Sequence, residues 1–516
     1  MTDALDHHAR RLADARLTDL ASARAGAPPL DAAGWRVDMA RQRLDEPAEA
    51  ALLDAARAVD LEGARDALFA GDIVNPSENR AALHWALRAQ SALEGAPEAV
   101  RQSLAAADGF AQAVRSGAAA GAGGRPFRAI VHLGIGGSDL GPRLLADALH
   151  MERDRRFELR FAANLDPLDI ELALDGLNPT ETLVIGVSKS FGTEETLYNL
   201  TRTRAWLETS LGADWTSHVA LVTANPARAE TWIGGPGRIF DMPETIGGRF
   251  SVWSAGSLAC TMAFGLEAIQ ALRAGAAEMD AHVQAAPIHT NAAMRLALLD
   301  YWNRSYLGAS MRIVLAYARR LRLLPAYLQQ LETESNGKSV RPDGSPAPRA
   351  TAPAIWGGEG TVGQHSYHQW LHQGTDAHPT EFVLALDENA ETEGQSALVA
   401  HALAQAEVLA NGRSLSDVHA EEPDLDEAIA RQKVHAGGRP STFLTHTDFS
   451  PRALGALIAL YEHRTYFAGR LWRVNAFDQW GVERGKTIAS RLKPAVQASG
   501  GAEDPVTATL LQRLRR

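Results

Sequence analysis

Cysteine is almost absent from this chain. The 516 residues include a single cysteine, Cys260, so no disulfide can form within the chain. A lone buried thiol is ordinary in a reducing compartment, where structural disulfides are rare. We therefore expect a cytoplasmic protein.

Positive charge is not in excess either. The net charge is −11 at neutral pH, and acidic and basic residues are mixed throughout the sequence. This balance argues against a nucleic-acid partner and favours simple solubility. An anionic ligand would therefore need a local pocket rich in cations or amide groups.

Long apolar runs are missing as well. Residues 1–11 place acidic residues ahead of basic ones and contain no apolar stretch, so they do not read as a signal peptide. The charge-free stretch 250–266 is shorter than a typical membrane span and contains three serines and a threonine. We expect a buried helix there and no association with a membrane.

The length and the glycine pattern indicate how the chain is organised. A chain of this length should hold two or more domains, because single cores stop growing near roughly 250 to 300 residues. Residues 1–125 are rich in alanine, leucine and arginine, and helical spacing over 50–68 and 80–93 predicts an N-terminal helical arm. The glycine-rich stretch 117–124 then predicts a loop.

From residue 126 onward, strand candidates alternate with helical stretches. This alternation predicts an α/β fold with two domains, over 126–285 and 286–500, each a mainly parallel sheet flanked by helices, and a tail over 501–516. In the first domain we expect strands at 129–133, 157–162, 182–187 and 218–222, with helices at 140–149 and 194–207. In the second we expect strands at 312–317 and 382–386, with helices at 295–306, 364–372 and 396–409.

A polar loop follows the expected strand 182–187 and precedes a helix. It contains Ser188, Lys189, Ser190 and Thr193. Amides and hydroxyls at a strand-to-helix corner form a natural anion site, because the positive end of the helix dipole faces the ligand. For such a loop in isolation, a Ser/Thr helix cap that binds nothing is the favoured interpretation.

Two other glycine clusters resemble nucleotide motifs but do not match them. The cluster that begins at Gly134 would need a glycine at the position of Asp139, and the one that ends in Gly337, Lys338 and Ser339 would need one at the position of Glu332. Taken alone, each is a tight turn. We therefore expect no nucleotide cofactor.

A carboxylate and an imidazole stand in two dense polar clusters, 334–338 and 363–367. Glu334 and His365 are the kinds of group that transfer protons near neutral pH. A competing use is zinc binding, because His365, His368 and His372 would share one face of a helix. We expect a polar, partly buried helix face instead, and no metal.

Four further clusters of polar residues and glycines lie at 134–142, 188–196, 247–253 and 475–486. With them the chain resembles the phosphoglucose isomerase family, also called glucose-6-phosphate isomerase, from about residue 130 to 490. The most specific segment runs from Asp478 to Lys486. The resemblance implies paired sugar-isomerase (SIS) domains and a homodimer with shared active sites. It also implies conversion of glucose 6-phosphate to fructose 6-phosphate through an enediolate, with no cofactor.

The resemblance also implies a role for each site residue. Glu334 matches the base, and Arg249 matches the cation that stabilises the enediolate. His365, presented by the neighbouring subunit, and Lys486 match the groups that open the sugar ring. The matched substrate-binding residues are Gly137, Ser138, Ser188, Lys189, Ser190, Thr193, Gln330 and Gln479. The side chain of Lys189 could serve structure instead.

The match has departures. Gly358 and Glu359 stand where the family has glutamate and proline, Val362 replaces an asparagine, and Gly192 replaces a threonine in the phosphate loop. Thr333 stands where a methionine usually precedes the base. These changes predict retuned loop bonding or affinity, and they leave the base and the histidine in place.

Two alternative functions fit parts of the pattern. A non-catalytic SIS regulator would need the phosphate loop but no base, so the joint presence of Glu334, Arg249, His365 and Lys486 argues against it. An isomerase that prefers another sugar phosphate would carry the same residues.

Overall fold

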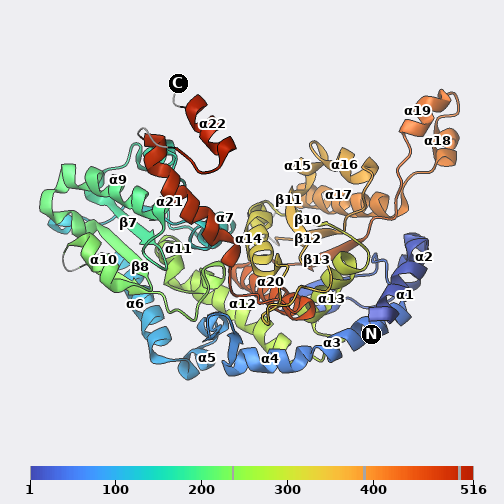
Figure 1. Cartoon of the computed structure of the whole chain (residues 1–516), viewed down its shortest axis with the longest axis horizontal. Helices are drawn as coiled ribbons and strands as arrows, with labels where there is room; N and C mark the ends of the chain where they lie inside the picture. The colour runs from blue at the N-terminus through green and yellow to red at the C-terminus, as the bar shows by residue number, and fades with distance from the viewer. Residues whose placement is uncertain (1, 235–236, 388–390, 498–500, 515–516) are drawn as a thin grey trace. The chain divides into compact units, whose positions relative to one another are not determined.

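The structure is a computed structural model that describes residues 2–234, 237–387, 391–497 and 501–514. The chain divides into two compact units, residues 1–476 and 477–516 (Figure 1). The first unit contains both large sheets, and the second contains the helices α21 (Glu483–Gln497) and α22 (Pro505–Leu514). Each unit is described by itself.

The first large sheet has five parallel strands in the order β6-β5-β7-β8-β9. Every residue of its three inner strands is buried, because helices cover both faces, which explains their continuous apolar sequences. The bounds are β5 (Ala129–Leu133), β6 (Glu158–Ala162), β7 (Thr182–Val187), β8 (Val219–Thr223) and β9 (Arg238–Asp241). The expected parallel α/β architecture is confirmed, and β5 and β7 match their predicted bounds.

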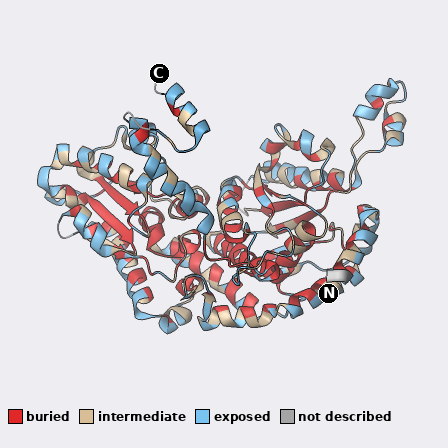
Figure 2. Cartoon of the chain, viewed as in Figure 1, coloured by how far each residue is buried: buried red, intermediate tan, exposed pale blue. Residues whose placement is uncertain are grey.

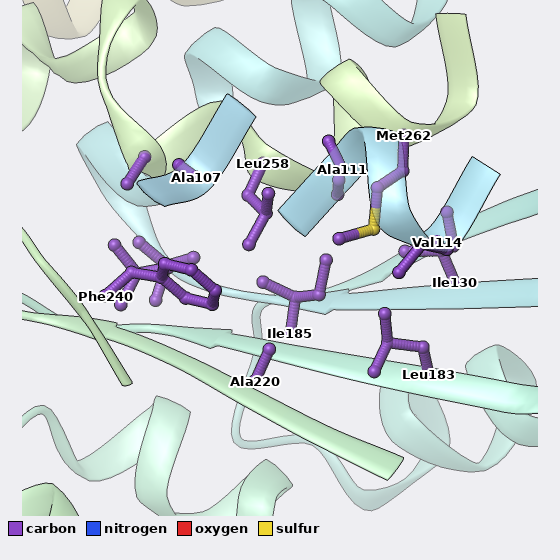
Figure 3. Close-up of a cluster of buried hydrophobic side chains, with 14 of the residues drawn as sticks. Ala107, Ala111, Val114, Ile130, Leu183, Ile185, Ala220, Phe240, Leu258 and Met262 are labelled. Carbon is purple, nitrogen blue, oxygen red and sulfur yellow. The ribbon is translucent and has the colours of Figure 1, made fainter. Parts of the chain in front are cut away.

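Helices α6 (Glu98–Ser116) and α11 (Leu258–Phe264) cover one face of this sheet (Figure 3). Ala107 and Ala111 of α6 lie beside Leu258 of α11, above Ile185 of the central strand β7. The other face packs against α8 (Pro167–Leu174), α9 (Glu194–Leu211) and α10 (Pro226–Ile233). The sheet is therefore closed on both sides, and only its strand ends are open for a site.

The second large sheet has six strands in the order β1-β2-β13-β12-β10-β11. Its four parallel strands are β10 (Met311–Ala316), β11 (Ala354–Glu359), β12 (Thr380–Ala385) and β13 (Ser441–His446). The predicted strands at 312–317 and 382–386 are therefore confirmed to within about two residues. Strands β11 and β13 were not predicted.

The N-terminal arm is mainly helical, as predicted, but it also contains strands that the sequence did not predict. Strands β1 (Leu30–Ala32) and β2 (Trp35–Asp38) form a hairpin, and β2 pairs antiparallel with β13. In β2, Trp35 and Val37 are buried while the residues between and after them are exposed. Burial thus alternates with a period of two residues, as expected for a strand with one buried face. The arm therefore completes the second sheet.

Three helix predictions also need correction. The stretch 50–68 is two helices, α3 (Glu46–Ala58) and α4 (Leu61–Ala70), because Asp60 between them is left-handed (φ 51°) and caps α4. The prediction of a helix over 80–93 is wrong. That stretch holds the short strand β4 (Arg80–Ala81), a 3₁₀ turn and the start of α5 (Gln90–Gly95).

The helix expected over 364–372 is broken as well. It is split between α15 (Gly360–Gln364) and α16 (His368–Gln373). The stretch 250–266 is buried as expected, but it begins as 3₁₀ turns before α11. Across the described residues no helix is both long and apolar enough to span a membrane.

Helix α20 (Pro451–Trp472), which the sequence did not predict, is buried along nearly its whole length (Figure 2). It packs against α12 (Leu266–Ala285), α13 (Ala292–Ser305) and α14 (Leu324–Asn336). Gly275 of α12 and Gly455 of α20 face the backbone of the other helix so closely that neither could carry a Cβ without displacement. The two helices consequently pack backbone against backbone.

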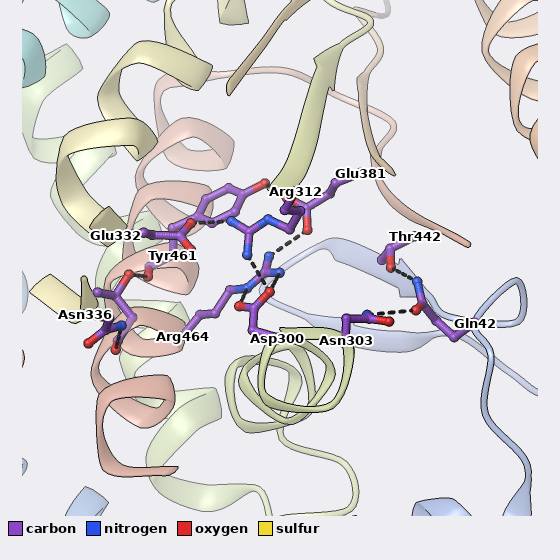
Figure 4. Close-up of polar contacts among 11 residues, drawn as sticks. Gln42, Asp300, Asn303, Arg312, Glu332, Asn336, Glu381, Thr442, Tyr461 and Arg464 are labelled. Atoms are coloured by element: carbon purple, nitrogen blue, oxygen red, sulfur yellow. Dashed lines mark hydrogen bonds and ion pairs between the residues drawn. The ribbon is translucent and has the colours of Figure 1, made fainter. Parts of the chain in front are cut away.

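A buried ion network joins these helices to the second sheet (Figure 4). Asp300 of α13 accepts from Arg312 of β10 at 2.7 Å and from Nε of Arg464 of α20 at 2.7 Å. Arg464 also pairs with Glu381 of β12 at 2.6 Å, and Arg312 pairs with Glu332 of α14. Burial opposes ionisation of Asp300, but the two guanidinium groups outweigh it and lower the pKa of this carboxyl group.

We predict that Asp300→Ala destabilises the protein strongly. The change leaves two buried guanidinium groups without a shared carboxylate, which should lower the free energy of unfolding by about 3–5 kcal/mol. Urea and thermal unfolding would measure this. The matched control is Asp54→Ala, which removes an exposed ion pair with Arg57 and should cost about 0.5 kcal/mol or less. Equal effects of the two changes would contradict the prediction.

Candidate active site

The candidate site is built from segments that follow strands of the first sheet, together with the end of α14. Parallel strands release their carboxyl ends at one edge of a sheet, which is where open α/β sheets bind ligands. The segments are the turn 134–138 after β5, the phosphate loop 188–193 after β7 and the segment 244–249 after β9. Helix α14 comes from the part of the chain that follows the first sheet.

The turn 134–138 lies against the backbone of the segment that carries Arg249. A Cβ at Gly137 would lie 2.5 Å from the Arg249 nitrogen and nearer still to the carbonyl group of Gly248, so only glycine fits. Gly136 adopts a left-handed conformation (φ 58°), which forms the turn. The carbonyl oxygen of Ser138 accepts a hydrogen bond from the ring of buried His132 at 2.6 Å.

The phosphate loop begins as soon as β7 ends. The hydroxyl of buried Ser188 donates to Oγ1 of Thr193 at 3.1 Å, and the Ser190 side chain is exposed. Thr193 is the N-cap residue of α9, yet its side chain makes no capping hydrogen bond. This observation weighs against the alternative in which the loop is only a helix cap.

Lys189 reaches toward the segment 244–249. Its Nζ donates to the carbonyl oxygens of Glu244 and Ile246, each at 2.9 Å. Burial lowers the pKa of this amine, and the positive charge of Arg80 lowers it further. The side chain therefore ties the phosphate loop to the segment 244–249, which is the structural role that the sequence had left open.

Arg249 and Glu334 lie side by side. Nη1 of Arg249 is 3.6 Å from Oε1 of Glu334, and the Arg249 side chain is 3% exposed while that of Glu334 is 22% exposed. Arg249 also donates from Nε to Ser335 at 2.7 Å and from Nη2 to the carbonyl oxygen of Ala476 at 2.7 Å. The guanidinium group is thus held in one position, next to a carboxylate that solvent or a ligand can reach.

Gln330 supports the same carboxylate from one helical turn earlier. Its Nε2 donates to Oε2 of Glu334 at 2.8 Å. The same nitrogen lies 3.0 Å from the place where a Cβ of Gly136 would stand, so Gln330 reaches the turn 134–138. Gln330, Glu334, Arg249 and Gly137 therefore form one group.

His365 lies outside this group. It follows α15, its side chain is exposed, and within the described ranges no hydrogen bond or ion pair reaches its ring. His368 and His372 instead turn inward, where Oε1 of Gln405 accepts from both rings at 3.0 and 2.7 Å. Burial lowers the pKa of both of these imidazoles and so favours their neutral forms.

The three histidines therefore do not converge, and no cluster of three or more metal-binding side chains occurs among the residues with a described placement. Gln479 and Lys486 belong to the second unit. Gln479 precedes a short 3₁₀ turn (Trp480–Val482), and Lys486 lies in the first turn of α21.

Two partners of Arg249 were not predicted. Ser335 lies directly after Glu334 in the sequence, so its position in a polar cluster was the only available signal. The carbonyl group of Ala476 carries no signal, because any residue type supplies one. Asn475, which precedes it, donates to Asn75 and Ser77, each at 2.8 Å, so contacts from distant segments hold this carbonyl group in place.

Fold and site together define a class: a two-sheet α/β protein in which a polar strand-to-helix loop and a carboxylate paired with a buried arginine follow the strands of the first sheet. The family model for phosphoglucose isomerase matches residues 38–511. Similar relatives are the glucose-6-phosphate isomerases of Caulobacter vibrioides and Xanthomonas campestris, which are 44% and 42% identical, each over 99% of this chain and 98% of the relative.

A solved glucose-6-phosphate isomerase from Chlamydia trachomatis matches the structure with a TM-score of 0.85 at 30% identity, over 100% of this chain and 98% of that one. A hypothetical protein from Thermus thermophilus matches 87% of this chain and 97% of its own, with a TM-score of 0.63 at 27% identity. The chain belongs to the phosphoglucose isomerase family, which confirms the resemblance inferred from its motifs.

The close approach at Gly137 generates a prediction. Gly137→Ala should lower the free energy of unfolding by about 1–3 kcal/mol, because the added methyl group meets the backbone at Gly248 and Arg249. Gly109→Ala is the control, since open space surrounds that exposed glycine of α6 and alanine favours a helix by about 0.5–1 kcal/mol. Urea unfolding of both variants would show whether they change stability in opposite directions.

Proposed function

We propose that this chain interconverts glucose 6-phosphate and fructose 6-phosphate through an enediolate intermediate, as part of glycolysis and gluconeogenesis. Its family and the names of its full-length relatives support this reaction. The observation in the structure that carries the proposal is the pairing of Glu334 with the buried guanidinium group of Arg249. A sugar-phosphate regulator would need no such pair.

Glu334 acts as the base. It takes the proton from C2 of the open-chain aldose and returns it to C1, so the carboxylate ends the cycle as it began. Its position at the end of α14, with one oxygen held by Gln330, leaves the other oxygen toward Arg249 and the opening of the site. A carboxylate presented in this way can act as general base and then general acid.

Arg249 stabilises the enediolate. Negative charge develops on the oxygen atoms at C1 and C2 when the proton leaves. Because Ser335 and Ala476 already orient the guanidinium group, no rearrangement is needed as the charge appears. Preorganised charge of this kind is usually the largest single contribution to catalysis.

The phosphate group binds at the loop after β7. Ser188, Ser190 and Thr193 supply hydroxyl groups at the N-terminus of α9, and the turn 134–138 adds Ser138 and the Gly137 amide. These donors suit a phosphate ester at a helix N-terminus. Lys189 contributes by holding the loop against the segment 244–249, as its two carbonyl partners indicate.

We assign ring opening to His365 and Lys486. Gln330 and Gln479 serve as sugar contacts, in a homodimer whose active sites combine residues of both subunits. The exposed ring of His365 supports presentation to a partner. We further propose a cytoplasmic location, which suits a chain whose single cysteine is buried.

The departures at the loop before His365 fit this function. Val362 lies on α15 with 63% of its surface exposed, so its side chain is not needed for packing within one chain. Glu359 ends β11, and its Oε1 lies 3.8 Å from Nε of Arg319. Among the described residues, no hydrogen bond or ion pair joins Glu359 to Glu334 or Arg249.

Replacing the base tests the proposal directly. Glu334→Gln keeps the shape of the side chain but removes its ability to accept a proton, so kcat should fall by roughly 10²- to 10⁴-fold while substrate still binds. A coupled assay for fructose 6-phosphate formation, run on a panel of sugar phosphates, would measure it. Glu359→Gln is the matched control and should retain turnover. Normal turnover in Glu334→Gln together with loss in Glu359→Gln would move the base to Glu359.

Mixing two inactive variants tests the shared site. If His365 is supplied by the partner, combining His365→Ala subunits with Glu334→Gln subunits should produce hybrid dimers in which one site holds both intact groups. Activity above that of either parent is the expected result, and mass spectrometry would confirm that subunits exchange. Heterodimers without restored activity would place both groups within one chain.

A further inference from the structure

An exposed arginine stands beside the phosphate loop without an acidic partner. Arg228 lies in the first turns of α10, which follows β8, and its Nη1 donates to the carbonyl oxygen of Ser190 at 3.3 Å. Within the described ranges no carboxylate pairs with it. Neighbouring surface arginines differ, because Arg202 pairs with Glu171 and Arg204 with Glu208. The positive charge of Arg228 is therefore available to a ligand.

Gly192 creates the space that this guanidinium group occupies. A Cβ at position 192 would lie 2.8 Å from Nη1 of Arg228 and 3.5 Å from the hydroxyl oxygen of Ser190. Any larger residue would have to displace the arginine, because 2.8 Å is shorter than a normal van der Waals contact. The guanidinium nitrogen and the Ser190 hydroxyl group thus flank the same small space in the loop.

Within the loop 188–193 itself, Lys189 is the only basic residue. Lys189, the loop's own basic residue, donates to the carbonyl oxygens of Glu244 and Ile246, and its amine is largely buried. A phosphate ester carries close to two negative charges at neutral pH. The hydroxyl and amide groups of the loop carry no positive charge that could offset it.

We propose that Arg228 binds the phosphate group of the substrate and that Gly192 allows it to approach. This inference rests on the proposed function and adds a binding residue to it. A planar guanidinium group can donate two parallel hydrogen bonds to phosphate oxygens, which an ammonium group cannot. Because Arg228 is exposed, its contribution weakens as ionic strength rises.

The test compares Arg228→Gln with the unaltered enzyme in two measurements. Calorimetric titration with inorganic phosphate should show a Kd about five- to tenfold higher, because a charge-assisted hydrogen bond is lost and solvent screens part of the contribution of this exposed group. Steady-state kinetics should show the same rise in KM for glucose 6-phosphate, with kcat within about twofold. Both differences should shrink in high salt, and Arg228→Lys should retain part of the affinity.

Gly192→Thr provides an independent variant. It should displace the guanidinium group and raise Kd and KM as Arg228→Gln does, and the double variant should be no worse than either single one. Arg202→Gln, on the adjacent helix α9, is the matched control and should change neither constant. Unchanged thermal unfolding would show that the fold is intact in each variant.

Two results would overturn the inference. One is an unchanged Kd for phosphate in Arg228→Gln. The other is that Gly192→Thr raises Kd and KM as much in the Arg228→Gln background as it does in the unaltered enzyme. The proposed function is judged separately. If the unaltered chain isomerises glucose 6-phosphate while Arg228 has no effect, only this inference fails. Phosphate binding that depends on Arg228 in a chain without isomerase activity would reject the function and retain the anion site.

Discussion

The buried ion network around Asp300 is the interaction on which the site depends most. It joins α13, α14, α20 and two strands of the second sheet, and its Glu332 lies on the same helix as Glu334 (Figure 4). An arginine without its carboxylate would be very costly in this interior, so the network holds one arrangement. The position of α14 follows from it, and that position places Glu334 against Arg249.

A second set of contacts holds the segments after β5, β7 and β9 to one another. Lys189 joins the phosphate loop to the segment 244–249, and the absence of a side chain at Gly137 lets the neighbouring turn lie against the same segment. These contacts involve main-chain atoms on at least one side. The site is therefore assembled before a ligand arrives. Its groups need not rearrange when charge develops in the transition state, which lowers the cost of stabilising that charge.

The predictions from sequence succeeded where the signal lies within a short stretch of residues and failed where tertiary contacts decide the structure. Strands β5 and β7 were placed to the residue, because uninterrupted apolar runs next to glycine clusters are visible within a short window. The helix over 80–93 failed for the opposite reason. Its apolar residues have helical spacing, yet Arg80 pairs with Asn75 in a short hairpin. Arg88 turns inward to Glu462 and Asp280, which come from distant parts of the chain. Distant partners overrode the local periodicity.

The sequence by itself determined the order of the motifs, the family and the types of chemical group at the site, because these depend on residue identity and short spacing. The tertiary structure alone decided which groups meet. It turned Lys189 toward two carbonyl groups, placed Ser335 on Arg249 and brought Arg228 into the space left by Gly192. The physical reason is that each of these contacts joins segments that are separate in sequence. The packing of helices and sheets sets its geometry, so neither segment carries a periodic sequence pattern that would predict it.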